Sequence, residues 1–126
     1  MFLEHGDPKL GTMFDIALRR FEEEISSTDD VFVSKHQNTS AYLTDLETGL
    51  RASMCAPFKI SARVTEAGFE GVDLGDTISG TCIAEANGYW LVYQPEWDTF
   101  VVFWGTQKDH LGAPGIEGSP LACWSS

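Results

Sequence analysis

Residues 87–105 read NGYWLVYQPEWDTFVVFWG, and this stretch decides the fold of the chain. Two runs of aromatic and β-branched residues, 89–94 and 99–104, flank the turn sequence PEWD, which is the pattern of a β-hairpin. The dipeptide Asn87-Gly88 favours a type I′ turn, because both central residues of that turn adopt positive φ. The segment before it, 77–86, is therefore expected to pair with 89–94. The sequence predicts a three-strand antiparallel meander.

Both faces of the predicted meander are apolar. Along 89–94, Tyr89, Leu91 and Tyr93 point to one face, whereas Trp90 and Val92 point to the other. Strands of this kind are covered on both sides or keep one face for a partner. One amphipathic helix covers one face. The second face is buried only if the sheet curls on itself or the C-terminal tail folds over it.

One helix is predicted near the N-terminus. Charged residues form one of its faces, and residues at helical spacing form an apolar face that consists of Phe14, Ala17, Leu18, Phe21 and Ile25. Thr12 stands where an N-cap residue is expected. The pattern predicts a helix over residues 13–26.

Further strands are predicted between this helix and the meander. Residues 58–66 alternate apolar and polar side chains, as in a strand with one buried face. Shorter apolar runs predict strands at 31–35, 40–46 and 50–54. Residues 67–76 contain three glycines and predict a bend, with at most one short strand around residues 69–72.

The tail, residues 105–126, is rich in Gly and Pro and is expected to be irregular. Its apolar end, residues 121–124, is expected to dock back on the body of the protein. The chain is thus predicted to be one α+β domain over residues 1–126. Its N-terminal amphipathic helix packs on a curved, mainly antiparallel sheet of about five to seven strands that ends in the meander.

The charge of the chain restricts the classes of partner. Nineteen acidic residues stand against eight basic ones, a net charge of −11, and no Lys or Arg occurs between Arg63 and Lys108. This charge disfavours nucleic acids and anionic membrane surfaces and favours a basic protein partner. No apolar run reaches the ~20 residues of a membrane span, and the first residues do not form a signal peptide, so we expect a cytoplasmic protein.

The residue types that carry catalysis or bind cofactors occur without a recognisable spacing. Three cysteines without a C-x-x-C pair argue against a disulfide framework and against a zinc site, and the three histidines are isolated. Cys123, His110 and Asp109 have the residue types of a catalytic triad, but they lie in a loop-rich tail that does not fix their geometry. No nucleotide-binding motif occurs. We expect no enzymatic activity, no cofactor and no metal.

The leading hypothesis is therefore an acidic protein-binding domain. Trp97, between two acids at the tip of the hairpin, is either an exposed anchor for a partner or folds back onto the sheet. The predicted contact residues are Glu22, Glu23, Glu24, Asp29, Asp30, Glu70, Asp73, Asp76, Glu96, Trp97 and Asp98. In size, charge and lack of cofactor motifs, such a domain is similar to bacterial immunity proteins, which neutralise basic nuclease toxins by covering their active sites. That likeness is one of physical properties, not of sequence pattern.

Two other classes of function stay open. In the first, the chain binds a small ligand or is an enzyme, with a cleft lined by aromatic residues and closed by the tail; the lining would be Tyr89, Tyr93, Phe100 and Trp104. In the second, the chain is a structural domain that pairs with itself through an open strand edge. For the leading hypothesis we expect a monomer or a weak dimer.

Overall fold

A computed structural model gives the fold, and it describes residues 8–31, 33, 38–69 and 71–125, with the backbone alone for residues 8–11. The elements, in chain order, are α1 (Pro8–Glu24), α2 (Thr39–Ala52), β1 (Met54–Val64), β2 (Thr77–Ala86), β3 (Tyr89–Gln94), β4 (Thr99–Trp104), β5 (Gly112–Ala113), β6 (Glu117–Gly118) and α3 (Pro120–Trp124). The predicted α+β class, with an N-terminal helix and a mainly antiparallel sheet, is confirmed.

The three strands of the meander lie where the sequence predicts them. β2, β3 and β4 have the predicted bounds, and β3 pairs antiparallel with both neighbours. The turn between β2 and β3 has φ of 55° at Asn87 and 85° at Gly88, as a type I′ turn requires. An Asn and a Gly tolerate this left-handed region, which explains why the turn forms at this dipeptide.

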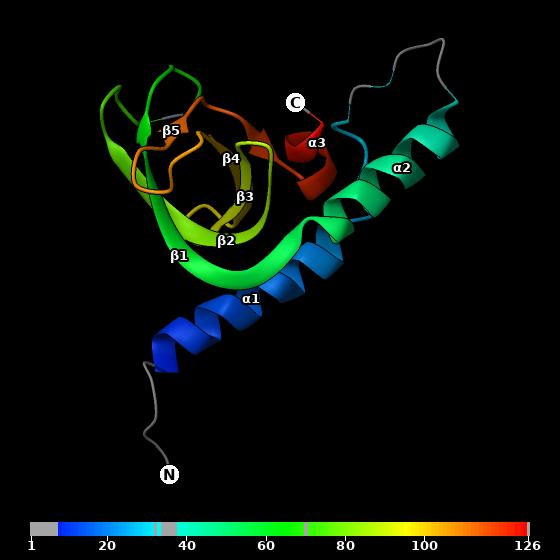
Figure 1. Ribbon diagram of the computed structural model, residues 1–126, viewed down its shortest axis with the longest axis horizontal. Helices are drawn as coiled ribbons and strands as arrows, with labels where there is room; N and C mark the ends of the chain where they lie inside the picture. Colours follow the sequence, from blue (N-terminus) through cyan, green and yellow to red (C-terminus); the bar gives the residue numbers. More distant parts are fainter. Residues whose placement is uncertain (1–7, 32, 34–37, 70, 126) are drawn as a thin grey trace.

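The sheet curls and closes on itself (Figure 1). β1 to β4 pair in order as antiparallel neighbours, and the two-residue strand β5 pairs with β4 on one side and with β1 on the other. The β1–β5 pair is parallel, and β6 adds to β4 next to β5. This closure provides the cover that the second apolar face of the meander requires.

Two cores result, one on each face of the meander. Leu91, Tyr93 and Phe100 join the core between the sheet and the helices, together with Phe21 and Leu50. On the opposite face, inside the curl, lies a core that includes Ile60, Val64, Val92, Val101 and Phe103. Full burial of one such large apolar side chain stabilises the fold by about 1.5–3 kcal/mol, so both cores contribute to the stability of the meander.

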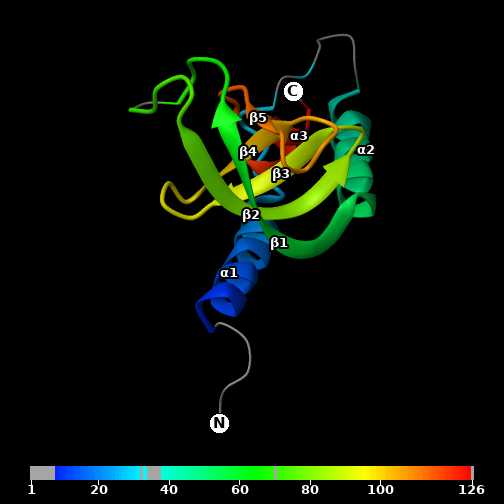
Figure 2. The same cartoon turned by 60° about the vertical axis from the view of Figure 1, so that its left-hand side comes forward.

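The helices surround the closed sheet. In both views α1 runs below β1 and β2, and α2 lies beside α3 (Figures 1 and 2). α1 begins at Pro8 and ends at Glu24, whereas the prediction was 13–26. Proline is well suited to the first turn of a helix because its missing N–H would have no intrahelical acceptor there. Thr12 therefore lies inside the helix, and its prediction as N-cap is wrong.

The strands predicted at 40–46 and 50–54 are wrong, because α2 occupies residues 39–52. The Asn38 side chain caps this helix by accepting a hydrogen bond from the Ala41 backbone N–H at 3.1 Å. Leu43, Leu46 and Leu50 stand at i, i+3 and i+7, which is one helical face. Gly49 lies inside the helix, although its residue type suggested a turn.

β1 begins at Met54 and ends at Val64, earlier at both ends than the predicted strand 58–66. The strand predicted at 31–35 is not formed at Val31 or Val33, and its other residues lie outside the described part of the chain. No strand forms at Phe69, Gly71 or Val72 either.

The tail is more regular than expected. It contains β5, β6 and the short helix α3, which the Ser119 side chain caps and Pro120 begins. Leu121 and Cys123 are buried in the first core, so the expected docking of the tail is confirmed.

Candidate functional site

The turn between β3 and β4, residues 95–98, is tied to α1 through Asp98. Its Oδ1 accepts a hydrogen bond from the Tyr93 hydroxyl at 2.6 Å and another from Arg20 Nε at 2.8 Å. Arg20 also donates through Nη1 to Glu23 at 2.7 Å and to Glu24 at 3.4 Å. One guanidinium thus joins three of the predicted acidic residues and holds the hairpin tip against the helix.

These contacts keep Asp98 charged. The Tyr93 hydroxyl, and after it the Arg20 guanidinium, hold the pKa of the Asp98 carboxyl below its usual value. Burial and then the neighbouring Asp98 raise the pKa of Tyr93 to about 12, so the phenol stays protonated and remains a donor. The hydrogen bonds to Glu23 and Asp98 raise the pKa of Arg20 above its usual value.

A hollow of about 260 Å³ opens beside this contact. Four predicted acids line it together with Arg20: Glu24, Asp29, Asp30 and Asp98. Asp30 has a structural role, because its carboxylate accepts hydrogen bonds from Ser119 Oγ at 2.7 Å and from the Ser119 backbone N–H at 2.9 Å. Burial acts to raise the pKa of Asp30, but the two bonds from Ser119 and one from the Asp30 backbone N–H together outweigh it, and the pKa is lowered. Asp30 therefore holds the beginning of α3.

Glu22 joins α1 to α2. Its carboxylate accepts hydrogen bonds from Arg51 Nη1 at 3.0 Å and Nη2 at 3.1 Å, and Arg51 Nε donates to Glu47 at 2.9 Å. The bonds from Arg51 lower the pKa of Glu22. The charge of Glu22 is thus partly balanced within the molecule, as are those of Glu23, Glu24 and Asp98.

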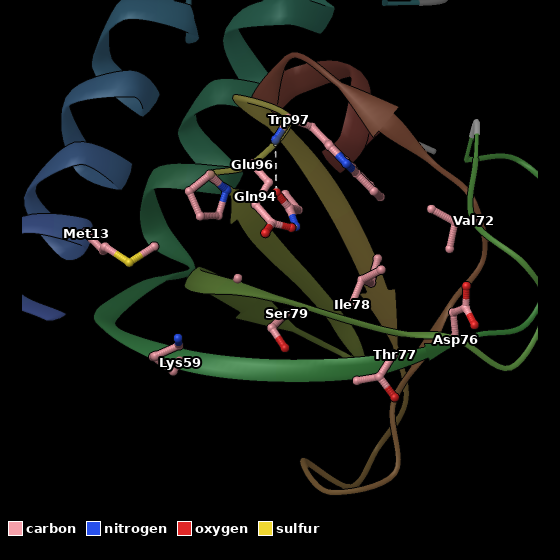
Figure 3. A pocket seen from close by; sticks show the side chains of 12 residues that line it. Met13, Lys59, Val72, Asp76, Thr77, Ile78, Ser79, Gln94, Glu96 and Trp97 are labelled. Carbon is pink, nitrogen blue, oxygen red and sulfur yellow. Dashed lines mark hydrogen bonds between the residues drawn. The ribbon is translucent and has the colours of Figure 1, made fainter. Parts of the chain in front are cut away.

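The hairpin tip also contributes Pro95, Glu96 and Trp97 to a groove of about 600 Å³ (Figure 3). Asp76, Glu96 and Trp97 of the predicted set line it, with Met13 from α1 and Lys59 from β1. Figure 3 shows Met13 and Lys59 at one end of the groove and Val72 and Asp76 at the other.

Trp97 is half-buried and folds back onto the molecule. Its ring packs against Phe69 with 5.3 Å between the ring centroids, and its backbone N–H donates to Gln94 Oε1 at 3.1 Å. Of the two expectations for Trp97, the structure favours the ring that packs on the body, while its remaining surface lines the groove.

Seven of the eleven predicted contact residues therefore meet around the hairpin tip: Glu24, Asp29, Asp30 and Asp98 in the hollow, and Asp76, Glu96 and Trp97 in the groove. Asp73 is next to the groove, since its backbone N–H donates to Asp76 Oδ2 at 3.0 Å. Glu22 and Glu23 lie along α1, and Glu70 is outside the described residues.

Sequence reasoning missed the residues that organise this region. Arg20 and Tyr93 fix the hairpin tip, but neither stands at a spacing that points to Asp98. Ser79 and Gly80 line the groove, and they do so only because β3 ends at Gln94 and does not cover the beginning of β2. Pro95 carried a usable signal, because a proline cannot donate to a ladder and so ends a paired strand.

The triad considered from the sequence is not assembled. Cys123 is buried and its thiol donates to the Phe100 carbonyl at 3.4 Å, while burial raises its pKa. His110 is exposed and lines a separate hollow with Ser61 and Arg63.

The four residues of the alternative hypothesis do not line a common cleft, because Tyr93 and Phe100 are buried whereas Tyr89 and Trp104 are exposed. Tyr93 and Phe100 belong to the first core with Leu121, and Tyr89 and Trp104 stack on each other at 5.9 Å between centroids.

In the part of the chain that the structure describes, no three His, Cys, Asp or Glu side chains gather closely enough to hold a metal ion. Within the same part, none of the helices has both the length and the apolar character of a membrane span.

Comparisons with protein-family models, with curated proteins and with solved structures find no match to this chain. The interpretation of the site therefore depends on its geometry and charge.

Proposed function

We propose that this chain is a non-enzymatic binding domain for a basic protein, which it contacts with the acidic surface around the hairpin tip. The observation that supports this is that seven predicted contact residues line two hollows, each of which includes residues of the turn 95–98. The finer proposal is that the partner is a cationic toxin such as a nuclease. The chain would then act in a bacterial cytoplasm as an immunity or inhibitor protein that covers the toxin active site.

Charge is the physical basis of this proposal. A net charge of −11 steers a basic partner to the molecule and speeds encounter. Four of the predicted acids make no ion pair with another described residue: Asp29, Asp73, Asp76 and Glu96. Their charge is therefore more available to a partner than the charge of Glu22 or Glu23, which arginines balance. The half-buried ring of Trp97 adds apolar contact area beside these acids.

The test begins with capture of the native partner from cells of the source organism on immobilised protein. We expect a basic protein that elutes with rising salt and whose affinity falls as ionic strength rises. The affinity of the captured, purified partner is then measured with the double variant Asp29→Lys/Glu96→Lys. We expect at least a tenfold loss, about 1.4 kcal/mol, because two attractive charges become repulsive.

The matched control is Asp45→Lys/Glu66→Lys, which makes the same change in net charge at exposed acids outside the two hollows. The control should change the affinity much less. If both double variants weaken binding equally, only the net charge matters and the proposed surface is wrong. For the finer proposal, the captured protein is assayed for nuclease activity, which stoichiometric amounts of this chain should inhibit.

A further inference from the structure

The beginning of β2 has a strand neighbour on one side only. β2 pairs with β1 from Thr77 onward, but its register with β3 begins at Thr81, opposite Tyr93. Beyond Gln94 the chain turns away at Pro95, which has no N–H to continue the ladder. Residues 77–79 therefore have β1 on one side and the groove on the other, whereas Gly80 already lies against the Tyr93 backbone of β3. All four residues line the groove.

The backbone of this edge points into the groove at alternate residues. Val64 N–H donates to the Asp76 carbonyl at 2.8 Å, a bond that flanks the pair Arg63↔Thr77. Because this bond joins the residues next to Arg63 and Thr77, the pair Arg63↔Thr77 itself has no backbone hydrogen bond between its members. Along an antiparallel ladder, pairs without hydrogen bonds alternate with hydrogen-bonded pairs. Thr77 and, two residues on, Ser79 accordingly direct their backbone N–H and C=O groups away from β1. These groups are donors and acceptors for a further strand.

The walls of the groove fit the side chains of such a strand. Val72, Ile78 and Trp97 provide apolar surface, and Ile78 belongs to the core inside the curl. Of the charged side chains in the lining, Asp76 and Glu96 are negative and Lys59 is positive. The lining thus combines apolar surface with net negative charge, next to strand groups that can hydrogen-bond.

We propose that the groove binds an extended segment of the basic partner, which pairs with Thr77 and Ser79 as an added β-strand. This inference rests on the proposed function and specifies how the partner is held. The open edge of three residues, 77–79, is about 10 Å long at the usual rise of a strand, enough to pair with a segment of about three residues. Backbone pairing provides affinity, while alternating apolar and basic side chains provide specificity.

The probe is the acetylated and amidated pentapeptide KVKVK, whose side chains alternate between basic and apolar. Its binding is followed by NMR through amide hydrogen exchange of the full chain. We expect exchange at Thr77 and Ser79 to slow at least tenfold when the peptide is bound. The same peptide with N-methylated valines keeps the charge but loses backbone donors, and we expect at least tenfold weaker binding. Equal binding of the two peptides overturns the proposal, as does unchanged exchange at Thr77 and Ser79.

Two variants at one position separate backbone pairing from side-chain effects. Ser79→Pro removes an N–H that points into the groove and not toward β1, and we expect it to weaken KVKVK binding at least tenfold. Ser79→Ala retains the N–H and removes only the hydroxyl, which bonds Ser61 Oγ at 2.7 Å. We expect this control to change affinity less than twofold. Both variants must show the far-ultraviolet circular dichroism of the parent; if Ser79→Pro does not, the N-methylated peptide decides.

The captured partner then distinguishes this inference from the proposed function. If Asp29→Lys/Glu96→Lys weakens the complex but Ser79→Pro binds like Ser79→Ala, the proposed function stands and the strand addition is wrong. If neither change matters, both are wrong. Pairing between two copies of this chain through the same edge is the competing occupant. Self-pairing would replace the proposal if sedimentation showed a dimer that Ser79→Pro dissociates, and if KVKVK did not slow amide exchange at Thr77 and Ser79.

Discussion

Asp98 is the residue on which the hairpin tip depends, because the Tyr93 hydroxyl and Arg20 Nε donate to the same carboxylate oxygen. We predict that Tyr93→Phe lowers the free energy of unfolding by about 1.5 kcal/mol at neutral pH, since it removes one hydrogen bond to a charged, largely exposed acceptor and leaves the buried ring in place. Urea unfolding followed by tryptophan fluorescence measures the change. A loss above ~3 kcal/mol would mean that the hydroxyl has further partners.

The same carboxylate predicts a pH dependence. The folded-state pKa of Asp98 is lowered, so its contribution is present above the unfolded-state value near 3.8 and is lost as pH falls through the lower folded-state value. The stability of the parent should thus fall more steeply between about pH 5 and pH 2 than that of Asp98→Asn. The difference should stay below ~1 kcal/mol, because the Asp98 side chain is 60% exposed and solvent screens its interactions. Parallel acid profiles of the two proteins would contradict this assignment.

The three cysteines differ in accessibility. Cys82 and Cys123 are fully buried, and burial raises the pKa of Cys82 to about 12, whereas Cys55 is partly exposed. Burial also raises the pKa of Cys55, which lowers its thiolate fraction. We predict that iodoacetamide at pH 8 adds slowly to Cys55 alone in the folded protein and to all three cysteines in urea. Peptide mass spectrometry identifies the sites; early labelling of Cys123 would show that α3 opens readily.

Among the secondary-structure elements, α2 has an N-cap whose contribution to stability can be tested. Asn38 caps the helix through the Ala41 backbone N–H, and cap substitutions of this kind cost about 1 kcal/mol. We predict that Asn38→Ala destabilises the protein by ~1 kcal/mol, while Asn38→Asp, which keeps an acceptor oxygen, has little effect. Thermal unfolding monitored by circular dichroism measures both. Equal destabilisation by the two variants would show that the capping oxygen is not what matters.

The elements that the sequence predicts well have strong signals close together. β3 and β4 combine aromatic and β-branched runs with the Asn87-Gly88 turn, and their predicted bounds agree with the structure. α2 instead carries threonines and Gly49 within a helical leucine pattern, and the turn-like residues suggested strands separated by a turn. The two-residue strand β5 depends on pairing with β1 and β4, which are distant in sequence, so no local pattern reveals it.

For the candidate site, as for the fold, the sequence predicted some of the residues but not their tertiary contacts. The acids could be named from composition, but their partners Arg20 and Arg51 act through tertiary contacts across 78 and 29 positions. The sequence therefore could not show that Glu22 and Asp98 hold elements together while Glu96 lines a groove. The stretch of β2 that pairs with β1 alone follows from where β3 ends and from the register between β2 and β3. In the sequence, only Pro95 indicates where β3 ends.

For the molecule as a whole, net charge opposes compactness. At a net charge of −11, the acidic side chains repel one another. This repulsion is strongest at about 0.01 M salt, where the Debye length is about 30 Å, and much weaker near 0.1 M salt, where the Debye length is about 10 Å. Screening also weakens the exposed ion pairs of Arg20 and Arg51, but such pairs contribute at most about 1 kcal/mol each. The many acid–acid repulsions outnumber these pairs, so salt should stabilise the fold.

We predict that raising sodium chloride from about 0.01 M to about 0.1 M stabilises the protein by ~1 kcal/mol, which corresponds to about 4 °C in the midpoint of thermal unfolding. The double variant Asp45→Asn/Glu66→Gln removes two exposed acids that lie away from Arg20 and Arg51, and its midpoint should rise less over the same range. A midpoint that falls with salt would mean that the ion pairs of α1 outweigh the general repulsion. The acids around the hairpin tip would then act first as internal ties, and charge alone would be too weak a basis for a basic partner.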